Sequence, residues 1–281
     1  MASEWMVRLG IFGGVFAIMA LWEVAVARRT LTHGRLRRWP NNLGLLLVDV
    51  AVLRLTIPGL AIAVAVAGES NDWGLMPYLG LPGPLAFVVA ILLLDLAIYF
   101  QHVMFHAVPT LWRLHRVHHS DVDVDVTTGT RFHPIEIVIS MGIKAAAVAA
   151  IGASPMAVLV FEVLLNASSM FNHASVSLPQ RLEALVRRVV VTPDMHRIHH
   201  SIVYNESSSN FGFNLSWWDR LFGTYRKHSL AGQDAMVLGV DAFRAARDLR
   251  LDRLLIQPLL DTPGGYAINR RPEAAAAPVV R

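Results

Sequence analysis

Histidines recur in three short groups with the spacing of a helical turn. The segment LHRVHHS begins at Leu114, MHRIHHS repeats the arrangement from Met195, and a shorter segment, HVMFH, precedes both. Because residues three or four apart lie on one face of an α-helix, each group can present two or three imidazoles in one direction. The eight histidines of these groups are His102, His106, His115, His118, His119, His196, His199 and His200.

Two further histidines complete the candidate site. His133 lies in RFHPIE and His173 in FNHASV, on either side of an apolar stretch. We predict both as members of the metal-binding set. For His173, ligation is favoured over a supporting hydrogen bond, whereas for His133 the sequence is equally compatible with the two roles. His33 and His228 have no helical partner, and we expect both at the surface.

The number of imidazoles indicates two metal ions. One zinc or iron ion takes about four to six ligands, so eight to ten histidines predict two ions with about four or five nitrogens each and an open position. The chain has no cysteine, which excludes thiolate-ligated haem, iron–sulfur clusters and cysteine-based zinc sites. The groups also lack the glutamates and Glu-x-x-His motifs of soluble di-iron bundles. Imidazoles suit iron, zinc, copper or nickel, and the residues alone leave that choice open.

The composition is typical of a membrane protein. Of the 281 residues, 54% are hydrophobic and 16% are charged, which is far from the average of soluble domains. A spanning helix needs roughly 20 apolar residues, and the candidates are Val7–Ala27, Leu43–Gly68, Pro84–Phe100, Ile135–Gly152 and Met156–Phe171. The last two are joined only by GASP and are predicted to form a hairpin. We therefore predict an all-α, multi-span transmembrane helical bundle with a cytoplasmic helical cap that holds a histidine-rich dimetal site.

The distribution of charge orients this bundle. The loop after the first segment, RRTLTHGRLRRWP, is rich in arginine, and the next loop, GESNDWG, is acidic. By the positive-inside rule, the amino terminus is outside and all histidine groups are on the cytoplasmic side. The 25 basic and 21 acidic residues form no basic stripe, so we expect no nucleic-acid partner.

The histidine segments and their surroundings resemble a known family. HVMFH, HRVHH and HRIHH, with RFHPIE, FNHASV and NFGFNLSWWDRLFGTY around them, are similar to the motifs of the fatty acid hydroxylase and sterol desaturase superfamily of integral membrane oxygenases. The likeness covers about Leu92–Tyr225; one departure is Val103, where many relatives have arginine. We expect N-terminal transmembrane helices at 1–82, a catalytic domain at 83–228, and a cytoplasmic segment at 229–281 with a disordered tail from about residue 264.

This resemblance implies a chemistry. Two iron ions, held by the ten predicted histidines and replaceable by zinc in purified protein, would use O2 and two electrons to hydroxylate or desaturate a C–H bond. The substrate would be a lipid from the bilayer: a sterol, a fatty acyl chain, an ether lipid or a related molecule. The chain has no dinucleotide fingerprint or haem-attachment motif, so a separate reductase, ferredoxin or cytochrome would supply the electrons. The Ala- and Arg-rich composition favours a bacterial inner membrane.

Carboxylates near the histidines are candidates for fixing imidazole tautomers. They are Asp95, Asp121, Glu136, Glu162 and Asp194. Asp95 fits equally well as a polar group in helix packing, and DVDVDV, from Asp121 to Val126, is predicted as a solvated loop. The segment WWDRLFGTY is expected to pack the cap against the membrane.

Two other functions fit parts of the pattern. An intramembrane zinc hydrolase needs a general base beside its ligands, as in H-E-x-x-H, and no glutamate occupies that place in the three groups. A metal transporter would have its histidines along a path at mid-membrane depth, whereas these gather at one face. The oxygenase is therefore the predicted function, the zinc hydrolase the first alternative and the transporter the second.

Overall fold

The computed structural model describes residues 2–261, and within this range its regular secondary structure is helical, with two isolated bridges between extended residues. The longer helices are α1 (Ala2–Ala25), α2 (Arg35–Thr56), α3 (Leu60–Ser70), α5 (Gly83–Ala107), α6 (Pro109–His119), α7 (Pro134–Ile151) and α8 (Pro155–His173). The shorter ones are α4 (Leu75–Leu79), α9 (Gln180–Val186), α10 (Pro193–His199), α11 (Tyr204–Ser207), α12 (Trp217–Leu221), α13 (Gly232–Ala235), α14 (Leu251–Ile256) and the 3-10 turns Thr128–Thr130, Ala246–Leu249 and Gln257–Leu259. The all-α prediction is confirmed. The tail predicted to be disordered lies outside the described residues.

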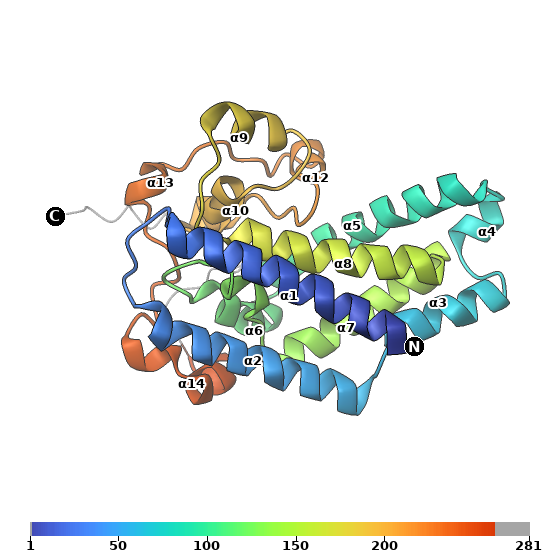
Figure 1. Cartoon of the computed structure of the whole chain (residues 1–281), viewed down its shortest axis with the longest axis horizontal. Coiled ribbons are helices and arrows are strands. Elements are labelled where there is room, and N and C mark those ends of the chain that lie inside the picture. The colour runs from blue at the N-terminus through green and yellow to red at the C-terminus, as the bar shows by residue number, and fades with distance from the viewer. Residues whose placement is uncertain (1, 262–281) are drawn as a thin grey trace.

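Helices α1, α2, α3, α5, α7 and α8 extend along the long axis, and α6 and the short helices other than α4 gather towards one end of it (Figure 1). We call residues 108–133 and 174–261, which form that end, the cap. Five segments have the length and composition of membrane spans: Met6–Ala25, Arg35–Leu79, Gly83–Ala107, Pro134–Ile151 and Pro155–His173. The apolar core between α3, α5, α7 and α8 is built from small, branched and aromatic side chains, among them Ala65, Leu94, Val148 and Phe161.

The apolar run over 43–68 predicts one span, but this span is not a single continuous helix. Helix α2 ends at Thr56 and α3 begins at Leu60. Between them, Pro58 has no amide hydrogen to donate, and Gly59 has a φ of +64°, which favours glycine. The chain is therefore interrupted inside this span.

Prolines determine where the histidine-bearing helices begin. Helix α5 ends before Val108, whose backbone is extended (φ −93°, ψ 117°) because the residue before a proline avoids the helical region. Pro109 then starts α6, so the last turn of α5 and the whole of α6 lie next to each other. Helices α7, α8 and α10 also begin with proline, a position where the missing amide costs nothing.

The predicted hairpin of α7 and α8 is confirmed. Its turn consists of Gly152, Ala153 and Ser154, and the Ser154 hydroxyl accepts a hydrogen bond from the amide of Ala157. Gly152 has a φ of +71°, and a side chain there would collide with the carbonyl oxygen of Trp73. The hairpin turn therefore packs directly against the chain that links α3 and α4.

The DVDVDV segment is buried, so the prediction of a solvated loop is wrong. The Arg38 guanidinium contacts Asp121 at 2.7 Å and Asp125 at 2.5 Å, and all three side chains are fully buried. Asp123 accepts hydrogen bonds from the amides of Thr32 and His33. Since Arg38 is on α2 and the aspartates follow α6, these contacts attach the cap to the spanning helices.

Candidate metal centre

Nine of the ten predicted histidines converge in two buried groups. The five-histidine group contains His102, His106, His115, His119 and His199; the four-histidine group contains His118, His173, His196 and His200. Within each group, the candidate ligand nitrogens lie within 4.8 Å of one another. The described residues thus supply two compact, all-nitrogen sets.

The two HxxHH segments divide their histidines between the groups in opposite ways. In α6, His115 and His119 belong to the five-histidine group and His118 to the other. At α10, His196 and His200 belong to the four-histidine group and His199 to the other. In each segment the i, i+4 pair shares one helix face and the third histidine lies on a neighbouring face. Both segments therefore link the two groups.

Backbone carbonyls fix the tautomer of four of these imidazoles. A carbonyl oxygen can only accept, so the ring nitrogen beside it must carry the proton. His102 Nδ1 donates to Phe211 and His199 Nδ1 to Ser209, both at 2.8 Å. In the four-histidine group, His118 Nδ1 donates to the carbonyl of Arg131 at 3.2 Å, and His173 Nδ1 to that of Ser169 at 2.7 Å.

These tautomers leave unprotonated nitrogens facing each other. His102 Nε2 lies 3.0 Å from His199 Nε2, and His118 Nε2 lies 3.1 Å from His173 Nε2. Neither member of such a pair has a proton to share, so two lone pairs are in contact and repel each other. A cation between them would turn this repulsion into ligation. One such pair occurs in each group.

The spacing of these pairs also fits a shared metal ion. Nitrogens bound to one ion at about 2.1 Å, and about 90° to 109° apart, are separated by about 3.0 to 3.4 Å. Two other contacts between imidazoles agree, with His106 Nε2 at 3.1 Å from His119 Nε2 and His196 Nε2 at 3.0 Å from His173 Nε2. His200, fully buried, has no hydrogen-bond partner for either ring nitrogen. The two groups therefore fit a dimetal site.

The imidazoles of the cap are neutral. Burial lowers the pKa of His115 to about 3, and burial with the neighbouring imidazoles holds the pKa of His118, His119 and His199 well below the ordinary value. Neutral imidazole is the form that ligates a metal. Four helices, α5, α6, α8 and α10, also end at the two groups. The partial negative charge of a helix carboxyl end favours a cation nearby.

Glu136 is the carboxylate that contacts the site. Its Oε1 accepts from His115 Nδ1 at 2.6 Å, which leaves His115 Nε2 free of a proton and without a hydrogen-bond partner. Glu136 is buried in the first turn of α7. Among residues 2–261, no other carboxyl group is hydrogen-bonded to any of the nine imidazoles. The five-histidine group therefore has a carboxyl partner on one outer ring nitrogen, and the four-histidine group lacks one.

The other candidate carboxylates have different partners. Asp95 accepts from Trp218 Nε1 at 2.8 Å and from the Asn214 side chain at 2.9 Å, so it attaches the WWDRLFGTY segment to α5. The remaining three form ion pairs: Asp121 with Arg38, Glu162 with Lys144 and Arg8, and Asp194 with Arg197. The expected packing of the WWDRLFGTY segment against the spans agrees with the contacts of Asp95.

His133 is not part of either group. Its Nδ1 accepts from the amide of Ile135 at 3.2 Å and caps α7, and its Nε2 lies 3.1 Å from the carbonyl of Leu255. Both ring nitrogens are occupied by the backbone, because Pro134 starts the helix directly after it. Of the two histidines expected at the surface, His228 is exposed, and His33 is half-buried with its Nε2 3.3 Å from the carbonyl of Arg244.

The residues that orient the imidazoles were missed by the sequence analysis. They act through main-chain oxygens, so their side chains give no signal. The aromatic rings beside the groups were missed as well. The ring centroids of Phe211 and Trp112 lie 5.1 Å and 4.9 Å from that of His106, and the Phe132 ring stacks on His118 with its centroid at 4.5 Å. These rings keep water away from the nitrogens.

Comparison with known proteins gives consistent matches. The family model described as fatty acid hydroxylase matches residues 87–224. An ornithine lipid hydroxylase of Rhizobium tropici is 28% identical over 229 residues, which are 76% of this chain and 66% of the relative. The human alkylglycerol monooxygenase is 28% identical over 50% of this chain and 31% of its own length. The human cholesterol 25-hydroxylase is 26% identical over 50% of this chain and 51% of its own length. The chain thus covers less than two thirds of each of these relatives. No solved structure matches it significantly.

Proposed function

The chain belongs to the fatty acid hydroxylase family, and we propose that it is an integral membrane, O2-dependent oxidoreductase that hydroxylates a C–H bond of a lipid. The observation that carries this proposal is the pair of facing, unprotonated imidazole nitrogens in each histidine group. These pairs support two bound cations. The nine grouped histidines are the proposed ligands, and His133 is proposed to have a structural role instead.

We propose iron as the metal. The three relatives are named as hydroxylases or a monooxygenase, which insert oxygen, and zinc has no redox chemistry. Iron in these groups would supply the activation of O2 with two external electrons. Zinc would occupy the same nitrogens in purified protein without supporting turnover.

The protein's own residues orient the ligands and exclude water. The carbonyl oxygens of Phe211, Ser209, Arg131 and Ser169 hold the Nδ1 protons, so that the Nε2 lone pairs face inward before any ion binds. This preorganisation limits the rearrangement that binding requires. Because all nine imidazoles are buried, a reactive oxidant would be protected from solvent. No further catalytic side chain is proposed.

The substrate is proposed to be a lipid that enters from the bilayer. The three relatives are named for an ornithine lipid, an alkylglycerol and cholesterol, which share apolar chains or rings rather than a headgroup. The histidine groups lie where α5 and α8 meet the cap, so an apolar chain could reach them from the membrane. Hydroxylation is preferred to desaturation because all three names denote oxygenation.

An external protein is proposed as the electron donor, a reductase, ferredoxin or cytochrome, on the cytoplasmic side of a bacterial inner membrane. The arginine-rich loop between α1 and α2 lies at the cap end, which supports this orientation through the positive-inside rule. An acidic donor would be attracted by the excess of basic residues. The three regions predicted from the sequence, 1–82, 83–228 and 229–281, remain our proposal for the domain organisation.

The zinc hydrolase and the transporter are less well supported. A hydrolase needs a free carboxylate as general base, and Glu136 is bonded to the outer nitrogen of His115. A transporter needs ligands along a transmembrane path, and these histidines lie at one end of the spans (Figure 1). Neither function explains two groups linked by the same helices.

Lipid analysis tests the proposal. Cells that express the chain should accumulate a lipid that has gained one oxygen, detected by mass spectrometry of whole lipid extracts, and His118→Ala should abolish this product while the protein still inserts into membranes. His133→Ala is the matched control and should retain both product and metal. A lipid that has only lost two hydrogens would indicate desaturation. Unchanged lipids with iron-loaded protein and a competent reductant would contradict the proposed activity.

A further inference from the structure

Two short helices of the cap, α9 and α12, carry exposed apolar side chains that nothing within residues 2–261 covers. Hydrogen bonds join the two elements: the Ser216 hydroxyl donates to the carbonyl of Arg187 at 2.7 Å, and Trp217 Nε1 donates to that of Arg188 at 3.1 Å. We call the exposed residues of these helices and their immediate neighbours the α9–α12 surface. Its large apolar members are Leu182, Leu185, Val189, Trp217, Leu221 and Phe222.

The charge of this surface has one sign. The exposed charged side chains between residues 180 and 228 are Arg181, Arg188, Arg220 and Lys227. The acids of the same stretch are buried or half-buried and have partners within the fold; Glu183, for example, pairs with Arg187. Exposed arginine and leucine therefore alternate without an exposed acid. This pattern suits an acidic, amphipathic partner.

A second basic region of the cap lacks these properties. The arginines at positions 247, 250 and 253 around α14 are also exposed. Acids accompany them, with Asp252 at 2.9 Å from Arg250 and Asp248 at 3.8 Å from Arg247. Net charge is therefore small there, so α14 provides an internal control.

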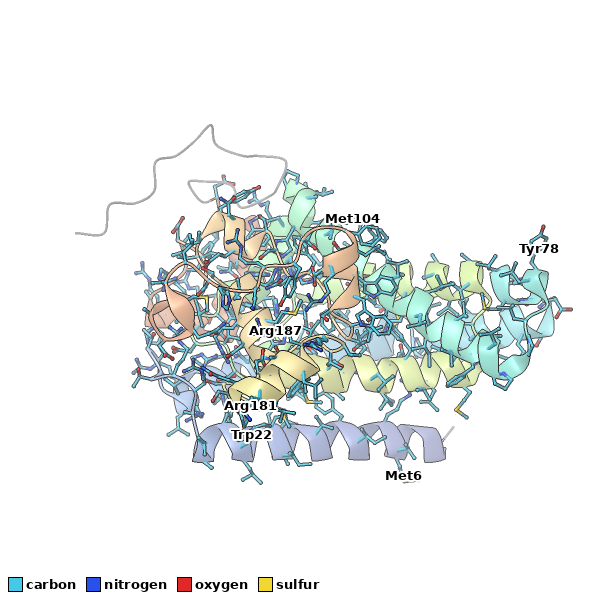
Figure 2. The ribbon with its side chains drawn as sticks, turned by 90° about the horizontal axis from the view of Figure 1, so that it is seen from above. Met6, Trp22, Tyr78, Met104, Arg181 and Arg187 are labelled. Atoms are coloured by element: carbon cyan, nitrogen blue, oxygen red, sulfur yellow. The ribbon has the colours of Figure 1, made fainter. Side chains whose placement is uncertain are left out.

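The position of the α9–α12 surface indicates which acidic partner it meets. Figure 2 shows Arg181 at the same level along the long axis as Trp22, three residues before the candidate span Met6–Ala25 ends. Helix α12 is attached to a second span, Gly83–Ala107, because Trp218 donates to Asp95 in the middle of that span and the Tyr99 hydroxyl lies 2.9 Å from that of Thr224. Helix α9 is therefore level with the boundary between hydrocarbon and headgroups, and α12 extends from it towards the hydrocarbon. Tryptophan, leucine and arginine are the residues expected at that boundary.

We propose that the α9–α12 surface lies in the headgroup layer of the membrane that the chain spans, and that it binds acidic lipid headgroups. Leu185 is 61% exposed and Leu221 is 69% exposed. Together with their apolar neighbours, they insert at the acyl boundary. Arg181, Arg188 and Lys227 contact the phosphates. The proposal depends on the membrane embedding of the chain and not on the reaction it catalyses.

This contact bears directly on the metal centre. The carboxylate of Asp219, in α12, accepts from the amide of Phe211, whose carbonyl holds His102 Nδ1. Helix α10, with His196 and His199, begins seven positions after α9 ends. Binding of headgroups at α9 and α12 therefore fixes the depth of both histidine groups relative to the bilayer.

Site-directed spin labelling tests the depth. The chain contains no cysteine, so Leu185→Cys on α9 and Asp252→Cys on α14 can each be labelled alone. In bilayer discs of phosphatidylcholine with roughly one third phosphatidylglycerol, the label at position 185 should be more accessible to O2, and the label at 252 to a water-soluble nickel chelate. Equal access of both labels to the nickel chelate would overturn the proposal.

Lipid retention tests the headgroup preference. The variant R181Q/R188Q/K227Q should retain at least tenfold less phosphatidylglycerol after detergent washing, measured by mass spectrometry, because each basic group at an acidic surface contributes to binding. The matched variant R247Q/R250Q/R253Q should retain the wild-type amount. Equal retention by both would refute the proposal. If R181Q/R188Q/K227Q retained the wild-type amount of phosphatidylglycerol but was reduced more slowly by an acidic electron-transfer protein, the surface would be assigned to that protein instead.

Discussion

Replacing Glu136 with glutamine should lower the metal affinity of the five-histidine group and leave that of the four-histidine group unchanged. Glutamine keeps an oxygen that can accept from His115 Nδ1, which lies 2.6 Å from Oε1 of Glu136, but it cannot carry the negative charge that a cation bound by His115 would favour on the carboxyl group. A hydrogen bond to a charged group contributes about 1.5–3 kcal/mol and a neutral one about 0.5–1.5 kcal/mol. The difference of about 1–1.5 kcal/mol predicts a loss of about tenfold in affinity, at the lower end of the range of about 10- to 100-fold known for such partners.

The assay is a metal titration against a competing chelator, with Zn2+ or Co2+ and the protein in detergent. Two binding steps are expected, and Glu136→Gln should weaken one of them by about tenfold. Glu162→Gln is the matched control, because Glu162 is a buried glutamate of the same hairpin that pairs with Lys144 at 2.9 Å instead of with a histidine. If Glu136→Gln changed neither step, or weakened both equally, the assignment of Glu136 to the five-histidine group would be refuted.

Four further changes test the surroundings of the site. Gly129→Ala would bring a Cβ within 2.6 Å of the Ser169 carbonyl oxygen, which holds His173, and should weaken metal binding only in the four-histidine group. Gly212→Ala would bring a Cβ within 2.6 Å of the Asp219 carboxylate, which holds the backbone of Phe211, and should weaken metal binding only in the five-histidine group. Arg38→Ala leaves buried aspartates unpaired and should destabilise the protein by about 3–5 kcal/mol in denaturant unfolding. Removal of metal with a chelator should lower the melting temperature by roughly 5 °C or more, because the facing lone pairs then repel.

Each of these has a control or a contrary result. Arg37→Ala, next to Arg38 but exposed, should leave the free energy of unfolding unchanged. If the two glycine variants lost the same ion, the division into two groups would be wrong. A melting temperature independent of metal would contradict the repulsion between lone pairs.

The sequence was sufficient to predict the spanning segments, apart from the interruption at Pro58 and Gly59, and the convergence of nine histidines. Spacings of three and four residues predict shared helix faces, and prolines mark the starts of α6, α7, α8 and α10. It could not predict how HRVHH and HRIHH divide between the two groups. That division depends on where α5 and α8 end in space, since His102 and His173 complete different groups.

The failures have a common physical cause, which is a partner distant in sequence. DVDVDV appeared solvated because its alternating charges have no local counter-ion, and the counter-ion is Arg38, more than eighty positions earlier. His133, for which the sequence left ligation and a supporting role equally open, lies outside both groups, and the backbone carbonyl of Leu255 lies 3.1 Å from its Nε2. The carbonyls that fix the tautomers belong to residues whose side chains play no part in those bonds.

The central claim is that two separate histidine groups each bind one metal ion, and metal content measures this most directly. Purified wild-type protein should contain two ions per chain, and His199→Ala and His196→Ala should each retain about one, lost from the five- and four-histidine groups respectively. Elution as a monodisperse, helical protein would establish that both variants are folded. A wild-type content of one ion or fewer after reconstitution with iron, or variants that keep both ions, would contradict the account.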